Sequence, residues 1–252
     1  MKLRELLSKM QEVQKNIGAS EMYLVGGTVR DKLLGNIGNI SDLDITNGTK
    51  DIDYLSQEFA KELKKTYSIT RKTMEDGHSS IFLGNLKIDF SSNFNAPNIE
   101  GILNKMGISN PTSLQKEVFS RDFTCNSLLL SLDLTKVLDI TKRGLPDIKE
   151  KKIRTCLSPE ITLTSNRNRV VRAIYLASKL GFDIDQSIID FVKNKPESIK
   201  ISSEKSLNEK LNQAFEKDAD RASHYLTQMN LWKYVPITES MYPYWKRISS
   251  AK

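Results

Sequence analysis

Two aspartates that are separated by one residue could hold a divalent cation. Asp42 and Asp44 flank Leu43 in a segment whose alternation of polar and apolar residues predicts a β-strand. Alternate residues of a strand face the same side of a sheet, so both carboxylates would point one way and Leu43 the other. Because neighbouring carboxylates repel each other unless water or cations separate them, the pair indicates either a metal site or the hydrated face of an edge strand.

A third carboxylate favours the metal site. The segment 86–90 predicts another strand, with Asp89 on the face opposite to Ile88. If this strand pairs beside that of Asp42 and Asp44, three carboxylates could surround two metal ions. Mg²⁺ prefers one or two carboxylates together with phosphate oxygens. Two such ions suit in-line nucleotidyl transfer, because one activates the attacking oxygen while the other holds the leaving phosphates.

A glycine pair precedes these aspartates. The apolar run 22–25 has the length of a strand, Gly26 and Gly27 follow it, and periodic apolar residues then predict a helix that ends near Gly35. Such a turn leaves backbone N–H groups at the positive end of the helix, where glycine lets phosphate oxygens approach. A glycine pair alone is more often only a turn. Its position beside the aspartates is what indicates a nucleotide site.

Five segments, in order along the chain, resemble the motifs of class II tRNA nucleotidyltransferases and bacterial poly(A) polymerases. They are VGGTVRD at 25–31, DLD at 42–44, RDFTCNSL at 121–128, DITKRGLPDIKEKKIR at 139–154 and the stretch 169–182. The family's own versions of the first three read GGxVRD, DxD and RRDFTxNAL.

This resemblance implies an α+β fold of the DNA polymerase beta-like nucleotidyltransferase superfamily. It implies an N-terminal nucleotidyltransferase head over residues 1–155, with a small mixed or antiparallel sheet and flanking helices. An all-α neck and a truncated body would follow over residues 156–252, where the incoming base and the RNA would bind.

The resemblance also implies roles for individual residues. Asp42 and Asp44 would ligate two Mg²⁺ ions, and Asp89 would be the third carboxylate, which helps to activate the primer 3′-hydroxyl. Nucleotide binding is implied for Gly26, Gly27, Arg30, Arg121, Asp122, Asn126, Asn166, Arg169 and Arg172. The implied reaction adds nucleotides from CTP and/or ATP to an RNA 3′ end, that of a tRNA receiving CCA, and releases pyrophosphate without using a template.

Two of these residues have a structural alternative. Arg30 would add positive charge near the triphosphate, or it would pair with Asp31 and orient the turn. Asp122 would lie near the ribose and triphosphate, or it would cap its local turn.

Asn166 and Arg169 would share a face of a helix predicted over residues 166–180 and would read the base through hydrogen bonds.

The sequence departs from the family at three positions. Asn166 stands where the family has an aspartate, Ser120 replaces the first arginine of RRDFT, and no arginine closely follows Asp89. Since an amide both donates and accepts hydrogen bonds, Asn166 could relax or change the choice of base. The alternatives are therefore a poly(A) polymerase or terminal transferase with altered nucleotide choice, and a weakly active RNA-binding or regulatory descendant.

Composition agrees with a nucleic-acid partner and a reducing compartment. The 252 residues hold 38 Lys and Arg against 31 Asp and Glu, which gives 38 − 31 = +7. A polyanion such as RNA fits this balance, as does an ordinary basic surface, so the charge alone does not decide between them. The two cysteines, Cys125 and Cys156, lack metal-type spacing and predict buried thiols rather than a disulfide. No apolar run has the length of a membrane span or the form of a signal peptide. We therefore expect a soluble cytoplasmic protein with no membrane contact, and the sequence assigns no oligomeric state.

Hydrophobic periodicity predicts the remaining elements. Strands are expected over 78–84 and 85–91, joined by a turn at Gly84 and Asn85, with a further strand or hairpin over 132–140. Helices are expected over 1–18, 51–65, 166–180, 184–193, 207–216 and 222–231. The segment 93–115 is rich in Asn, Ser, Gly and Pro, and it predicts a mobile loop or an inert connection.

Overall fold

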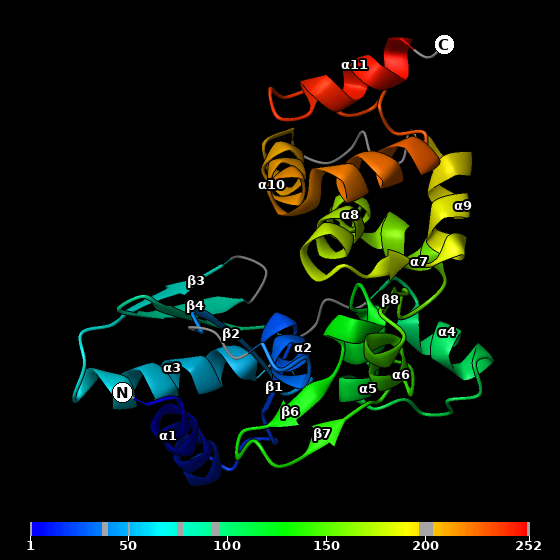
Figure 1. Cartoon of the computed structure of the whole chain (residues 1–252). Helices are drawn as coiled ribbons and strands as arrows, with labels where there is room; N and C mark the ends of the chain where they lie inside the picture. Colours follow the sequence, from blue (N-terminus) through cyan, green and yellow to red (C-terminus); the bar gives the residue numbers. More distant parts are fainter. Residues whose placement is uncertain are drawn as a thin grey trace. The chain divides into compact units, whose positions relative to one another are not determined.

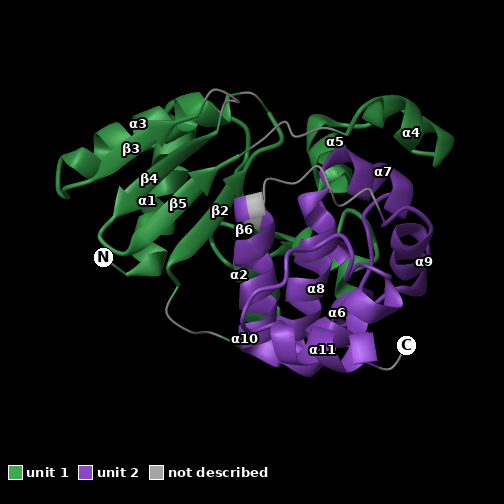
Figure 2. Cartoon of the chain, turned by 90° about the horizontal axis from the view of Figure 1, so that it is seen from above, with its two compact units in different colours: residues 1–121, 125–145 green, residues 122–124, 146–252 purple. Residues whose placement is uncertain are grey.

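The computed structural model describes residues 2–36, 40–49, 51–74, 78–91, 96–196 and 204–250 (Figure 1). The chain divides into two compact units, which Figure 2 colours separately. Unit 1 comprises residues 1–121 and 125–145, and unit 2 comprises residues 122–124 and 146–252. The domain boundary expected at residue 155 stays a prediction. No helix in the described part of the chain is both long enough and apolar enough to cross a membrane.

Unit 1 is built on a mixed seven-stranded sheet with the strand order β3-β4-β5-β2-β1-β6-β7. The strands are β1 (Tyr23–Val25), β2 (Asp42–Thr46), β3 (Thr70–Thr73), β4 (Ser79–Leu83), β5 (Leu86–Phe90), β6 (Leu129–Ser131) and β7 (Val137–Leu138). β2 and β5 run parallel, and the other neighbouring strands of this sheet run antiparallel. This sheet and its helices confirm the predicted α+β class. β3 is an all-polar edge strand, TRKT, so it offers no alternation from which a strand could be predicted.

Two helices cover one face of this sheet. α1 (Leu3–Asn16) packs against α3 (Ile52–Lys64), and α3 packs against β4 and β5 (Figure 1). The ring centroids of Phe59 on α3 and Phe90 on β5 lie 6.3 Å apart. Leu43 of β2 and Ile88 of β5 are completely buried on this face. Since burial of apolar surface stabilises a fold by about 25 cal/mol per Å², the apolar side of these two strands is fixed here and their polar side faces away.

α5 (Ser113–Ser120) covers the opposite face at the β1 and β6 end of the sheet. Val118 of α5 shares one buried cluster with Tyr23, Val25 and Leu129. Thr112 caps the helix, because its hydroxyl accepts from the backbone N–H of the third helical residue at 3.2 Å and that residue's side chain bonds back to Thr112. The carboxylate-bearing part of the sheet is therefore bordered by a well-capped helix.

The prediction of a loop over 93–115 is wrong over residues 99–105 and 113–115, which are helical. α4 (Ile99–Lys105) and the start of α5 lie in this segment, whereas residues 92–95 lie outside the described part of the chain. Ile99 and Leu103 are buried. Tertiary burial of a few apolar side chains therefore stabilises a helix that the polar composition obscures.

Unit 2 is mostly helical. Its helices are α7 (Pro159–Ser165), α8 (Asn168–Leu180), α9 (Gln186–Asn194), α10 (Glu204–Gln228) and α11 (Tyr242–Ser250), and α6 (Gly144–Lys149) crosses the division between the units. α10 is broken at Asp218, whose φ of −160° and ψ of 94° are not helical, between the two helices predicted there. A short parallel ladder of β8 (Lys152–Ile153) and β9 (Asp183–Ile184) adds strand structure to the predicted all-α neck.

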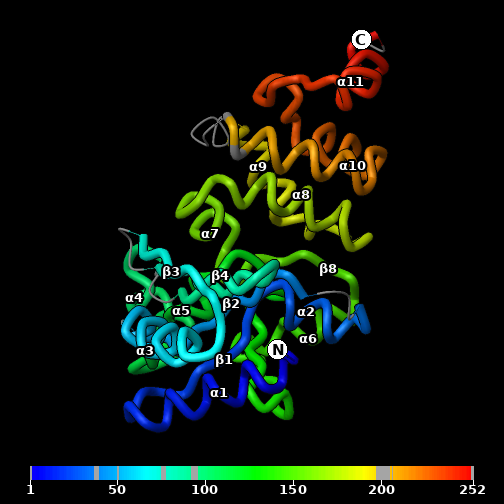
Figure 3. Tube along the Cα trace, turned by 90° about the vertical axis from the view of Figure 1, so that its left-hand side faces the viewer, coloured from blue at the N-terminus to red at the C-terminus, as the bar shows by residue number. Residues whose placement is uncertain are grey.

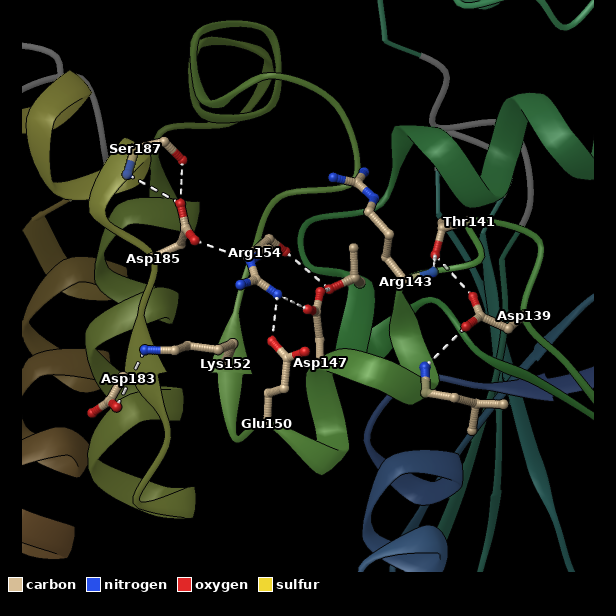
Figure 4. A network of polar contacts seen from close by, with 12 residues as sticks. Asp139, Thr141, Arg143, Asp147, Glu150, Lys152, Arg154, Asp183, Asp185 and Ser187 are labelled. Atoms are coloured by element: carbon tan, nitrogen blue, oxygen red, sulfur yellow. Dashed lines mark hydrogen bonds and ion pairs between the residues drawn. The ribbon is translucent and has the colours of Figure 1, made fainter.

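An ion pair inside unit 2 holds Thr124. Asp147 of α6 is 1% exposed, and its carboxylate accepts from Thr124 Oγ1 at 2.5 Å and from Arg154 Nη1. Arg154 also donates to Glu150 at 3.1 Å and to Asp185 at 3.0 Å (Figure 4). The backbone N–H of Thr124 donates to the carbonyl oxygen of Arg154 at 2.9 Å. Side-chain and backbone bonds thus fix this short segment to the rest of unit 2.

Candidate active site

The side chains of Asp42, Asp44 and Asp89 lie on one face of the sheet in unit 1. β2 and β5 pair in parallel with Asp44 opposite Asp89 and with Asp42 opposite Lys87. Side chains that lie opposite each other in a ladder share a face, and the intervening Leu43 is buried on the other face. The condition that strand 86–90 pairs beside the first two aspartates is therefore met. The action of these carboxylates as metal ligands stays a prediction.

Asp89 is held by two neighbours. Its Oδ1 accepts a hydrogen bond from Ser80 Oγ on β4 at 2.5 Å, and its Oδ2 lies 2.5 Å from the Lys87 ammonium. Burial acts to lower the pKa of Lys87, but the hydrogen bond to Asp89, the charge of Asp89 and the charges of Asp42 and Asp44 outweigh it and raise this pKa. Neither Lys87 nor Ser80 is among the predicted site residues. Lys87 could have been predicted from its one-residue spacing to Asp89, which places both side chains on the same face of the strand. Nothing in the sequence indicates that Ser80 lies beside Asp89.

The acidic face carries negative charge that a cation would balance. Burial and the charge of Asp89 raise the pKa of Asp42, against the opposing effect of Lys87. Among the described residues, no three His, Cys, Asp or Glu side chains form a ready-made metal cage. Mg²⁺ does not require one, because it commonly takes one or two carboxylates and completes its octahedron with water and substrate phosphates. Carboxylate oxygens on two adjacent strands therefore fit Mg²⁺ that binds together with a phosphate ligand.

Gly26 closes the turn against Asp44. Its φ of +80° is left-handed, and a Cβ at this position would lie 2.5 Å from Asp44 Oδ2. Thr28 Oγ1 donates to the backbone oxygen of Asp42 at 2.9 Å and ties the start of α2 (Gly27–Leu33) to β2. Glycine is thus required both by the backbone and by the carboxylate contact. The predicted order of strand, glycine turn and helix is confirmed.

Arg30 is buried and supports the turn. The residue is 2% exposed, and its Nε and Nη2 lie 2.8 and 2.6 Å from Asp31 Oδ1. Its Nη1 donates to Asn126 Oδ1 at 2.5 Å. Of the two alternatives for Arg30, the structure shows the ion pair with Asp31. Asn126 helps to hold the same guanidinium, and direct contact of either residue with a nucleotide stays a prediction.

Arg121 is connected to β2 through Glu117. Arg121 Nη2 lies 2.5 Å from Glu117 Oε1, and the other carboxylate oxygen accepts from the hydroxyl of Thr46 at the end of β2. Glu117 is only 4% exposed, so these two donors satisfy a carboxylate that is buried. Glu117 was not predicted as a site residue. The feature of the sequence that could have indicated Glu117 is its position directly before the apolar residues 118 and 119 of α5.

In unit 2, Asp122 forms an ion pair with Arg172. Arg172 Nε and Nη2 lie 2.8 and 2.7 Å from Asp122 Oδ2, and Asp122 Oδ1 accepts from the backbone N–H of Phe123 at 2.7 Å. Burial acts to raise the pKa of Asp122, but the charges of Arg172 and Arg169 outweigh it and lower this pKa. Asp122 therefore bonds to the next backbone N–H and to Arg172, while its two predicted roles, as a cap of the turn and in nucleotide binding, both stay predictions. Two other predicted binding residues, Arg169 and Arg172, lie close enough for their charges to act on the Asp122 carboxylate.

Asn166 does not belong to a helix. α8 begins at Asn168, and Asn166 is extended, with φ of −154° and ψ of 107°. Its Oδ1 accepts from the backbone N–H of Asn168 at 3.1 Å, a local bond that competes with helix formation. The prediction that Asn166 and Arg169 share a helix face is therefore wrong. Arg169 Nη1 donates to the Thr162 carbonyl and to Ser165 Oγ, both at 3.0 Å.

Comparison with known protein families assigns this chain to one of them. The profile described as the poly(A) polymerase head domain matches residues 22–154, just over half of the chain. The chain belongs to this family. The poly(A) polymerase head domain match runs from β1 to β8 and includes the glycine turn and the three aspartates of the acidic face. Asn166 and Arg169 lie after it.

Named relatives extend the likeness into unit 2. The chain is 29% identical over 232 residues to tRNA nucleotidyltransferase cca2 of Schizosaccharomyces pombe, which covers 85% of this chain and 46% of that protein. It is 30% identical over 178 residues to the A-adding tRNA nucleotidyltransferase of Aquifex aeolicus, which covers 68% of this chain and 20% of that protein. A solved tRNA nucleotidyltransferase in complex with a primer tRNA and an incoming ATP analog has a TM-score of 0.65 at 26% identity, over 89% of this chain and 60% of that one. The chain thus spans less than half the length of both relatives.

Proposed function

We propose that the protein is a template-independent nucleotidyltransferase that adds nucleotides from CTP, ATP or both to the 3′ end of a tRNA. The observation that carries this proposal is the register of β2 and β5, which sets Asp44 opposite Asp89 and beside the turn at Gly26. Membership in the poly(A) polymerase head domain family supports it, as do relatives named CCA-adding and A-adding enzymes. Two buried free cysteines agree with a cytoplasmic location.

The side chains of unit 1 divide the work of this reaction. Asp42 and Asp44 would hold Mg²⁺, and Asp89, which Ser80 and Lys87 orient, completes the acidic face toward the primer 3′-hydroxyl. Bound Mg²⁺ would supply Lewis-acid stabilisation of the charge on the phosphates. The 3′-hydroxyl gives its proton to a carboxylate of the acidic face or to water, and its oxygen forms a bond to the α-phosphorus as the bond from this phosphorus to the bridging oxygen of the β-phosphate breaks, so that pyrophosphate leaves.

Recognition of the base falls to unit 2 in this proposal. Arg169 presents donors to ring acceptors, and the exposed amide of Asn166 both donates and accepts. A carboxylate at position 166 would accept only, so the amide discriminates less strictly among exocyclic groups. Addition of A alone, or altered nucleotide choice, is therefore the second candidate function, and the A-adding relative supports it.

Incorporation by the purified protein tests the proposal. The protein is incubated with Mg²⁺, a tRNA that lacks its CCA end, and each labelled triphosphate in turn. Ordered addition of C, C and A supports the proposed function, and A tracts or single A residues support the second candidate. Absence of incorporation by a folded sample that still binds tRNA would contradict both and favour an RNA-binding descendant.

Replacing Gly26 with alanine should impair catalysis more than folding. Alanine at this φ destabilises the fold by about 1–2 kcal/mol, while its Cβ displaces the Asp44 carboxylate. Because small displacements of reacting groups lower rates steeply, we expect transfer to fall by about 10²-fold. Gly35→Ala is the matched control, since φ there is +76° and nothing lies within 4 Å of an added Cβ. Equal transfer rates in the two variants would contradict the contact with Asp44.

Replacing Asn166 with aspartate should sharpen the choice of base. A carboxylate that accepts from exocyclic amines favours C and A over U and G, and one such contact changes selectivity by about tenfold. The measurement is the ratio of incorporation rates for the four triphosphates. Asn194→Asp, at an exposed position of α9, makes the same chemical change elsewhere in unit 2. Unchanged ratios in Asn166→Asp would remove this residue from base recognition.

A further inference from the structure

A lysine lies among the three aspartates of the acidic face. In the parallel ladder Lys87 stands opposite Asp42, and Asp89, two residues after the lysine, stands opposite Asp44. The four side chains therefore share one face of the sheet. Figure 3 shows β2 and β4 in this part of the sheet, with α3 packed beside β4. Because α3 covers the apolar face, these four side chains lie on the face opposite that helix.

The Lys87 ammonium forms an ion pair with Asp89. Lys87 Nζ lies 2.5 Å from Asp89 Oδ2, and Asp89 Oδ1 accepts from Ser80 Oγ at the same distance. Both oxygens of this carboxylate are therefore already bonded to donors. The charges of Asp42 and Asp44 also act on the Lys87 ammonium. One positive charge thus offsets part of the repulsion among all three carboxylates.

The ammonium can leave this position without disturbing the core. The Lys87 side chain is 42% exposed, whereas that of Asp89 is 22% exposed. Lysine has a flexible four-carbon stem, so its charged end can turn into solvent while Ser80 still holds Asp89. A divalent ion that binds to Asp89 Oδ2 would take the place of the ammonium, because two cations at one oxygen repel each other.

We propose that Lys87 is a built-in counter-cation of the acidic face, which stabilises the metal-free protein and lowers the affinity of the face for divalent ions. This inference deepens the proposed function and rests on its metal site. Lys87 opposes the ion in two ways. Its ion pair with Asp89 has to break, and its charge repels a cation that binds at Asp42 or Asp44. Lys87 is thus a positioning residue for Asp89 that also sets the metal requirement.

Lys87→Met tests the inference, because methionine keeps much of the apolar stem and removes the charge. Lys61→Met is the matched control. Lys61 lies on α3, away from the acidic face, and pairs with Glu58 at 2.6 Å, so both variants lose one lysine of an ion pair. The dissociation constant of Mn²⁺, used in place of Mg²⁺, is measured by electron paramagnetic resonance on the nucleotide-free protein. Binding that Asp44→Ala abolishes is assigned to the acidic face.

Lys87→Met should bind Mn²⁺ about tenfold more tightly than Lys61→Met, because a repelling charge beside the ion is gone. In EDTA it should unfold roughly 2–4 °C below Lys61→Met, because the three carboxylates then lack this counter-charge. Saturating Mg²⁺ should reverse that difference, since tighter binding to the folded state adds more stability. Lys87→Arg keeps the charge and should restore the wild-type metal affinity, which a role of the stem alone would not require.

Two failures are distinguishable. If Lys87→Met bound Mn²⁺ no more tightly than Lys61→Met, the inference would be overturned while the metal site remained. If the wild-type protein bound no Mn²⁺ that Asp44→Ala abolishes, the metal site of the proposed function would itself be refuted. Lys87→Gln makes the same change of charge and replaces Lys87→Met if the latter does not fold.

Discussion

Asp44→Ala is expected to reduce nucleotide transfer by at least about 10³-fold, because metal-assisted charge stabilisation is worth several kcal/mol. Asp44 lies opposite Asp89 in the β2–β5 ladder and next to the turn at Gly26. Asp42 and Asp89 are at other positions of the ladder, so neither can replace the Asp44 carboxylate beside this turn. The rate is measured as single-turnover incorporation of labelled CTP and ATP into a tRNA that lacks its CCA end, at saturating Mg²⁺.

The variant should remain folded, because Asp44 is on the polar face of the sheet and its removal leaves the apolar face of β2 unchanged. Asp51→Ala is the matched control. Asp51 is exposed just before α3 and makes no side-chain cap bond, so its loss changes the charge of unit 1 equally. Asp42→Ala tests the partner carboxylate independently. Wild-type turnover by Asp44→Ala or Asp42→Ala would refute the metal assignment.

The acidic face could be predicted because each of its strands has only one buried side. In β2 and β5 the alternation of carboxylates with Leu43 and Ile88 fixes which side chains share a face. A shift of one residue would expose the apolar set, so the pattern fixes the face even though it does not reveal the partner strand. The pairing of Asp44 with Asp89 required tertiary structure.

Asn166, α4 and Lys87 were not predicted correctly, each for a different physical reason. Asn166 carries a side-chain oxygen that accepts from Asn168 N–H, and this bond starts α8 two residues later than the periodicity indicates. The helix α4 depends on burial of Ile99 and Leu103, which an Asn-rich segment conceals. Lys87 was overlooked because lysine on a strand usually reads as a solvated residue, whereas here it balances Asp89.

Long-range ion pairs are the features least accessible from sequence. Asp147 and Arg154 form an ion pair within one short stretch of sequence, and both also accept a hydrogen bond from Thr124, which lies more than twenty positions before either of them. Asp122 and Arg172 are fifty positions apart. The sequence shows which residues are charged but not which of them pair, because the fold of the backbone between two residues sets the distance between their side chains.

Asp147→Ala should destabilise unit 2 by about 3 kcal/mol, because removal of one partner leaves a buried network unsatisfied. Asp147 is 1% exposed and accepts from both Thr124 Oγ1 and Arg154 Nη1. Its loss leaves the Thr124 hydroxyl without this acceptor and turns Arg154 toward Glu150 and Asp185 alone. For a protein of this size the midpoint of thermal unfolding should fall by roughly 6–12 °C.

Glu150→Ala separates burial from charge in the same network. Glu150 contacts the same guanidinium at 3.1 Å, but its side chain is 54% exposed, and exposed ion pairs contribute only about 0–1 kcal/mol. The two variants therefore remove one negative charge each from Arg154 and differ in desolvation. If Asp147→Ala unfolded at the same temperature as Glu150→Ala, the bond between Asp147 and Thr124 would not be what holds residues 122–124 in unit 2. Asp122, which lies in that segment and pairs with Arg172, would then owe its position to the arginine.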